Sequence, residues 1–214
     1  MAVEAYREAT QATDHLLLGS PDLELGIAWV EDRAGVRATV GGVHPGVGTK
    51  NALISLGEST YLEIISPDPD QDTFSFPIDL PGLSEPRLVA WAVQVDDLKK
   101  LAYEAGSEEL DFRDGARRTP EGESLSWKTM RIKNRFGSPE VEPFPFFIEW
   151  GGDSQYPAVS SPGGCRLLGI EITHEDPVGF ENALADFGVG GKVREGAGRI
   201  VATIETPRGT IEIE

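Results

Sequence analysis

Three polar side chains in otherwise apolar, strand-like segments have the chemistry to bind a metal ion or to move a proton. His15 follows Asp14 in the segment DHLLLG, and Glu63 and Glu149 lie in the segments YLEIIS and FFIEW. A carboxylate in such a strand is costly unless it is paired, hydrogen-bonded or bound to a cation. One histidine and two carboxylates could hold a divalent metal ion, or could act as acid and base around a bound carbonyl compound.

Each of these residues also has a structural interpretation. Backbone groups or the neighbouring Asp14 could satisfy the ring nitrogens of His15, and an arginine on an adjacent strand, such as Arg37, could pair with Glu63. The same kind of pairing could account for Glu149. The residues alone leave both interpretations open.

A second candidate group surrounds the glycine-rich segment GGVHPGVGT at 41–49. Glycines permit unusual backbone angles and a close approach of the chain to a ligand. We expect His44, Thr49 and Asn51 to donate hydrogen bonds to a substrate at the mouth of a pocket; the alternative is an exposed, bulged turn. Trp91 and Trp127 are candidates for lining an apolar ligand pocket, although alternation along strands assigns at least half of the aromatic residues to the core.

Other catalytic chemistries find little support in the sequence. No GxSxG, CxxC or HExxH pattern is present. Cys165, the single cysteine, precedes a strand-like segment and is more typical of a packed residue than of a nucleophile. His174 lies at a predicted junction of strand and helix, where capping and surface roles are common.

The composition restricts the partners and the compartment. The 214 residues include 36 Asp and Glu against 19 Lys and Arg, a formal net charge of −17. This balance disfavours nucleic acids and anionic membranes, which require cations on the protein. The acidity indicates a solvated surface, with adaptation to high salt or steering of cationic ligands as alternatives. A single cysteine and an N-terminal segment without a signal-peptide pattern lead us to expect a cytoplasmic protein.

The elements that must position the candidate residues recur three times. Each copy begins with a strand pattern, continues with an aspartate typical of a helix N-cap, and then shows apolar residues on one helical face. The predicted caps are Asp22, Asp97 and Asp176. Further strand-like stretches follow each helix, so the sequence predicts an α+β protein of repeated βαβββ units.

The units and the segments between them can be bounded approximately. Segments rich in Pro, Gly, Ser and Asp are typical of linkers. Because a lone four-stranded unit leaves a sheet face uncovered, we expect all units to share one assembly. The predicted units are 13–66, 87–150 and 165–214, and the predicted linkers are 67–86 and 151–164.

The sequence resembles the glyoxalase-like domain proteins of the vicinal oxygen chelate superfamily over essentially the whole chain. The resemblance rests on the segments DHLLLGSPDL, GGVHPGVGTKNALISLG, YLEIISPDP, WAVQVDDL, SLSW, PFFIEWG and ITHEDP. It implies curved mixed sheets that surround a concave pocket. In this superfamily, metal ligands usually lie on the first and last strands of each unit and face that pocket.

Carrying these ligand positions onto this sequence gives an incomplete set. The first-strand positions are His15, Ala90 and Gly169, and the last-strand positions are Glu63, Glu149 and Glu212. The resemblance therefore implies a divalent metal at most on His15, Glu63 and Glu149.

Two functions follow as expectations. The first is a metal-dependent isomerase, lyase or dioxygenase for a small oxygen-rich or carbonyl compound, with Glu63 and Glu149 as catalytic residues. The second is a metal-free protein of the bleomycin-resistance type that binds or sequesters an aromatic or cationic small molecule. Ala90 and Gly169 favour the second function, and His15 with Glu63 favours the first. A homodimer is a further expectation, because the third unit could pack within the chain or between two copies.

Overall fold

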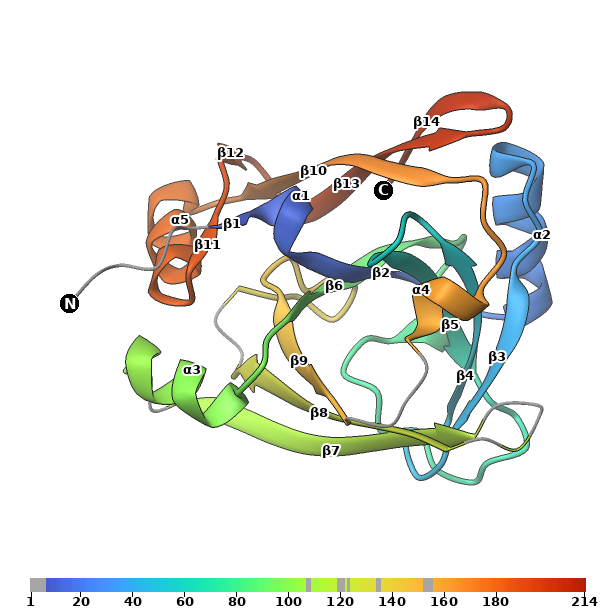
Figure 1. The fold of residues 1–214 in the computed structure, drawn as a ribbon, viewed down its shortest axis with the longest axis horizontal. Helices are drawn as coiled ribbons and strands as arrows, with labels where there is room; N and C mark the ends of the chain where they lie inside the picture. The colour runs from blue at the N-terminus through green and yellow to red at the C-terminus, as the bar shows by residue number, and fades with distance from the viewer. Residues whose placement is uncertain (1–6, 107–108, 119–121, 123, 134–135, 152–155) are drawn as a thin grey trace.

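An eight-stranded barrel with a second sheet against its outer face organises the chain (Figure 1). The computed structural model describes residues 7–106, 109–118, 122, 124–133, 136–151 and 156–214. Within these residues, no helix is long and apolar enough to cross a membrane. The fold is the predicted α+β class with a curved mixed sheet.

The first two units each show the predicted βαβββ order. In the first unit the elements are β2 (Thr13–Gly19), α2 (Leu23–Ala34), β3 (Thr39–His44), β4 (Thr49–Ser55) and β5 (Tyr61–Pro67). In the second unit they are β6 (Arg87–Gln94), α3 (Leu98–Ala105), β7 (Leu110–Arg118), β8 (Ser124–Ile132) and β9 (Phe146–Trp150).

These two units together close the barrel, in the order β2-β5-β4-β3-β7-β8-β9-β6. Within each unit the first strand pairs in parallel with the last, β2 with β5 and β6 with β9. The two first strands, β2 and β6, pair antiparallel and join the units on one side. On the other side β3 meets β7 through the single pair Val43 and Arg118.

The third unit lies outside the barrel. Its elements are β10 (Arg166–His174), α5 (Pro177–Asp186), β11 (Val189–Gly190), β12 (Val193–Glu195), β13 (Arg199–Thr206) and β14 (Gly209–Ile213). The sheet β12-β10-β13-β14 runs along one side of the barrel, with α2 at its edge (Figure 1). Its buried residues Ile200 and Ile204 share one apolar core with Leu16 and Leu62 of the barrel wall.

Short elements complete the structure. They are β1 (Arg7–Glu8), which pairs with β11, the helix α1 (Ala9–Ala12), the 3₁₀ turn η1 (Leu80–Gly82) and the helix α4 (Pro157–Ser160). Both η1 and α4 fall in segments predicted as linkers. The backbone of Ser75 donates to the carbonyl of Val47, which ties the first of these segments to the barrel.

The three predicted helix caps are confirmed. The side chain of Asp22 accepts a hydrogen bond from the backbone N–H of Leu25, and Asp97 accepts from two N–H groups of α3. Asp176 accepts from the N–H of Gly179 at the start of α5. An aspartate at this position satisfies a backbone donor that the helix itself cannot pair.

Removing one of these caps should weaken the third unit measurably. We expect Asp176→Ala to lower the free energy of unfolding by about 1 kcal/mol, the usual cost of a lost N-cap. Glu175→Ala is the matched control, because Glu175 is exposed and has no hydrogen bond or ion pair within the described residues. Urea unfolding measures both values. Equal stabilities of the two variants would contradict the capping role.

Candidate functional site

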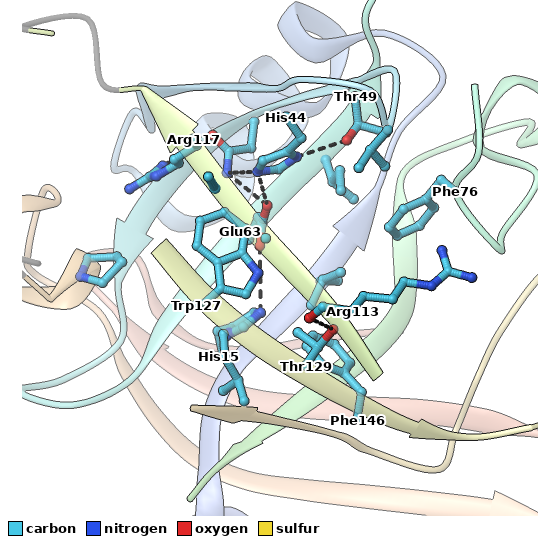
Figure 2. Close-up of a pocket in the computed structure, with 18 of the residues that line it drawn as sticks. His15, His44, Thr49, Glu63, Phe76, Arg113, Arg117, Trp127, Thr129 and Phe146 are labelled. Carbon is cyan, nitrogen blue, oxygen red and sulfur yellow. Dashed lines mark hydrogen bonds and ion pairs between the residues drawn. The ribbon is translucent and has the colours of Figure 1, made fainter. Parts of the chain in front are cut away.

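The barrel encloses a cavity of about 180 Å³ (Figure 2). Its lining combines a polar group at one end with aromatic side chains and arginines on the walls. The polar group is His15, His44, Thr49, Asn51 and Glu63, the aromatic residues are Tyr61, Phe76, Trp127, Phe146 and Trp150, and the arginines are Arg113, Arg117 and Arg131. Every described lining residue precedes the third unit: the first two units supply most of the lining, and the predicted linkers add Ser75, Phe76, Pro77 and Pro157.

His15 reaches the cavity from β2 in a fixed orientation. Asp14 is an extra residue between the pairs Thr13–Val93 and His15–Ala92, which makes it a β-bulge. A bulge re-aims side chains locally, and here Asp14 Oδ1 lies 2.6 Å from His15 Nδ1. The other oxygen, Oδ2, accepts from Trp150 Nε1 at 3.1 Å and from the Tyr156 hydroxyl at 2.7 Å. Since a carboxylate accepts, Nδ1 carries the proton and Nε2 faces the cavity.

Glu63 meets His15 at this point, as the sequence predicts. Its Oε2 lies 3.6 Å from His15 Nε2, and its Oε1 accepts a 2.8 Å hydrogen bond from Asn51 Nδ2. The side chain is largely buried, with the residue 8% exposed. Arg37 is not its partner, because that exposed side chain pairs with Glu24 and Glu31.

The residues expected to donate hydrogen bonds to a substrate also bind one another. Asn51 Nδ2 also lies 3.3 Å from His44 Nε2, and His44 Nδ1 lies 2.8 Å from Thr49 Oγ1. Asn51 Oδ1 accepts from the guanidinium of Arg117 at 3.3 Å. His44, Thr49 and Asn51 line the cavity, and the hydrogen bond from Asn51 also holds Glu63 in position. Figure 2 shows His15 and His44 converging on Glu63 from two sides.

His44 is held in its neutral form. Burial lowers the pKa of His44 most strongly, and Arg117 and His15 lower it further, while Glu63 opposes them. A neutral ring with its proton on Nδ1 donates to Thr49 and accepts from Asn51 at Nε2. This tautomer agrees with the amide orientation that lets Asn51 donate to Glu63.

Two glycines make room for the wall facing Glu63. Gly41 is the extra residue of a second β-bulge, between the pairs Val40–Ala52 and Gly42–Asn51. A Cβ atom at Gly41 would lie 2.3 Å from Arg117 Nη1. A Cβ atom at Gly115 would lie 2.2 Å from Trp127 Nε1. Glycine is therefore required at both positions for these two side chains to lie where they do.

The structure places two of the candidate residues elsewhere. Phe146, Ile148 and Trp150 of β9 face the cavity, so Glu149 points out of the barrel, where its Oε2 accepts from the backbone N–H of Leu98 at 2.9 Å. The predicted grouping of Glu149 with His15 and Glu63 is corrected accordingly. Trp91 is 0% exposed in the main core and donates to the carbonyl of Pro143. Trp127 does line the cavity and contacts His44 edge-on at 5.9 Å.

The donor set does not fit the divalent metal that the superfamily implies. A catalytic zinc site, for example, takes three protein ligands. Within the described residues, no group of three or more His, Cys, Asp and Glu side chains could hold a metal ion. His15 and Glu63 supply two donors, Ala90 supplies none, and Glu149 faces away. His44 Nε2 is already engaged by Asn51 and is not available as a third donor.

The two arginines that β7 contributes to the cavity are not apparent from local sequence patterns. Arg113 and Arg117 lie on β7, and the segment LDFRDGARR gives no clear strand pattern because it lacks an apolar alternation. Arg113, Gly115 and Arg117 nevertheless alternate with a period of two, which places them on one face. That spacing is the signal that could have identified them.

A barrel built from two βαβββ units around a polar cavity is the architecture of the vicinal oxygen chelate superfamily. The glyoxalase-like domain model matches residues 13–188, and the chain belongs to that family. No curated protein matches the chain in sequence.

Solved structures resemble it at low sequence identity. A hypothetical protein from Staphylococcus aureus shares 13% identity with a TM-score of 0.64, over 94% of this chain and 98% of that one. Methylmalonyl-CoA epimerase from Mycobacterium tuberculosis shares 16% identity with a TM-score of 0.45, over 70% and 91% of the two chains. A methylmalonyl-CoA epimerase in complex with methylmalonyl-CoA and NH4+ shares 14% with a TM-score of 0.46, over 70% and 97%. The first likeness supports the fold.

Protonation of His44 should cost stability in acid. Because its pKa is lowered on folding, the unfolded chain binds this proton more readily, and stability falls as the pH drops below about 6.5. Urea unfolding at pH 7.5 and 5.5 should therefore show a larger loss for the parent than for His44→Gln. An identical loss in both proteins would contradict the assignment of a neutral His44.

Proposed function

We propose that the chain binds a small oxygen-bearing organic compound in the barrel cavity and that Glu63, together with His15, moves a proton on it. The observation that carries this proposal is the approach of Glu63 Oε2 to His15 Nε2 at 3.6 Å, inside the cavity. Both atoms belong to side chains whose other ends are fixed by hydrogen bonds. Fixed groups of this kind are already oriented toward each other, and a shift of a few tenths of an ångström brings the two atoms within hydrogen-bond distance.

The proton transfer can be written from the side chains alone. The carboxylate of Glu63 takes a proton from a carbon next to a carbonyl group of the ligand, which leaves an enolate and a neutral carboxyl group. Returning the proton to the same or a neighbouring atom regenerates the carboxylate and gives an isomer or the original compound. His15 can accept the proton from Oε2 at its Nε2, since Asp14 already binds its Nδ1 proton.

The rest of the cavity suits a small ligand with an unsaturated or apolar part. Tyr61 stacks on His15 at 4.6 Å, and Phe146 meets the same ring edge-on at 5.5 Å. Trp127 and Trp150, paired residues of the adjacent strands β8 and β9, pack together at 5.6 Å. These rings exclude water around the acid–base pair and strengthen its electrostatic interactions.

A metal-free binding protein remains the second candidate function. The aromatic side chains that line the cavity favour it, because such surfaces hold ligands without chemistry. The two candidates differ in what Glu63 does. In an enzyme Glu63 must exchange a proton with the ligand, whereas in a binding protein its replacement changes only affinity.

Hydrogen exchange on a ligand separates them. We expect the parent protein in D2O to catalyse deuterium uptake at carbon 3 of 2-oxobutyrate or 4-phenyl-2-oxobutyrate, followed by proton NMR. Glu63→Gln keeps the shape but removes the base, so the rate should fall by about 100-fold or more. Glu149→Gln, on a carboxylate that faces away from the cavity, is the matched control and should leave the rate unchanged.

The enzyme proposal is contradicted if the ligand takes up deuterium as fast with Glu63→Gln as with the parent. Binding of these ligands by the parent without any uptake would instead assign the chain to the binding class.

A further inference from the structure

We infer that the ligand of this cavity is a small organic carboxylate and that Arg117 holds its carboxylate group beside Glu63. This inference rests on the proposed binding of a ligand in the barrel cavity and names the chemical class of that ligand.

The first observation is a buried guanidinium with few partners. Arg117 is 5% exposed and lines the cavity. Its one hydrogen bond within the described residues goes to the neutral amide of Asn51, at 3.3 Å. No carboxylate of the described residues lies within ion-pair distance of it. A guanidinium has five N–H donors, so most of its hydrogen-bonding capacity is available to a ligand.

A buried cation with no charged partner is expected to bind an anion. Removing a charge from water is costly, and the cost is offset only by a partner of opposite charge with good geometry. The planar fork of a guanidinium matches the two oxygens of a carboxylate. The protein carries a formal net charge of −17, so an arginine-lined cavity is not a consequence of its composition.

A second arginine supplies the charge that a further anion requires. Asn51 separates Arg117 from Glu63, and Arg131 adds a further positive charge to the cavity that Glu142 and Asp111 offset in part. Arg131 lines the same cavity, and its Cζ lies 4.4 Å from the centre of the Phe146 ring. Burial lowers the pKa of Arg131 to about 10, against the opposing effect of Glu142, so it remains a cation at neutral pH.

The contacts also place the ligand carboxylate relative to the base. Asn51 binds Arg117 through Oδ1 and Glu63 through Nδ2, so one side-chain amide separates the guanidinium from the carboxylate of Glu63. A ligand carboxylate on Arg117 therefore brings its adjacent carbon atoms toward Glu63. The arginines disfavour the cationic ligand that was an alternative from the sequence.

The test compares a carboxylate with its neutral ester. We expect the parent to bind 4-phenyl-2-oxobutyrate at least about 10-fold more tightly than the methyl ester, measured by calorimetry, since hydrogen bonds to a charged group are stronger than those to a neutral one. Arg117→Met should abolish this preference while the ester still binds. Arg37→Met is the matched control, because Arg37 is exposed and paired with Glu24 and Glu31 on the outer surface.

Circular dichroism establishes that each variant is folded. If Arg117→Met does not fold, Arg131→Met replaces it, and we expect that variant to weaken the preference severalfold. Equal affinity of the parent for acid and ester would overturn the inference, as would a parent that binds none of glyoxylate, 2-oxobutyrate and 4-phenyl-2-oxobutyrate. A separate result contradicts the proposed proton transfer alone: the parent binds a 2-oxo acid with the expected preference over the ester, but the bound acid takes up no deuterium.

Discussion

The burial of Glu63 inside a barrel is the constraint on which the rest of the site depends. A carboxylate in this position needs compensation, and Asn51 provides it by joining Oε1 of Glu63 to the guanidinium of Arg117. Because an amide can donate and accept at once, it lets the two charges stabilise each other without direct contact. Direct pairing would occupy both groups, whereas this arrangement leaves Oε2 of Glu63 and most N–H groups of Arg117 for other partners.

Two irregularities in the strands make this arrangement possible. The bulge at Asp14 turns a carboxylate toward Nδ1 of the following residue, which regular alternation would place on the opposite face. The bulge at Gly41 removes a side chain that would collide with Arg117 and Asn51. Both bulges lie in the first unit, one on each side of Glu63. The regular hydrogen-bonded ladders form the barrel, and the two bulges position the polar side chains around Glu63.

Local patterns in the sequence identify much of the fold and part of the site. The aspartate caps can be predicted from the sequence because capping depends on a side chain and the backbone two or three residues away. His15 and Glu63 can be identified as candidate site residues because each is a polar residue on an apolar strand. The register of β2 and β5 brings the two side chains together: Leu17, two residues after His15, lies opposite Glu63 in this parallel pair.

The rest of the site depends on contacts between distant segments. Glu149 has the same local pattern as Glu63 but lies on the outer face of β9, one residue out of phase with the cavity. Arg117 is 66 residues from Asn51 in the sequence, and it lies on a strand too polar to be identified by its apolar residues. Trp91 and Trp127 both lie on predicted strands, but Trp91 packs in the main core and Trp127 lines the cavity.

The two barrel units share an order of elements but contribute different chemistry. The first unit supplies His15, Glu63 and the polar residues that hold them, from β2, β3, β4 and β5. The second unit supplies arginines and tryptophans from β7, β8 and β9, while its first strand presents alanines at Ala90 and Ala92. A symmetric pair of units would place equivalent ligands around a central ion. This asymmetric pair instead sets the carboxylate of Glu63 on one wall against cations on the other, and such a polarised cavity suits the anionic ligand that we propose.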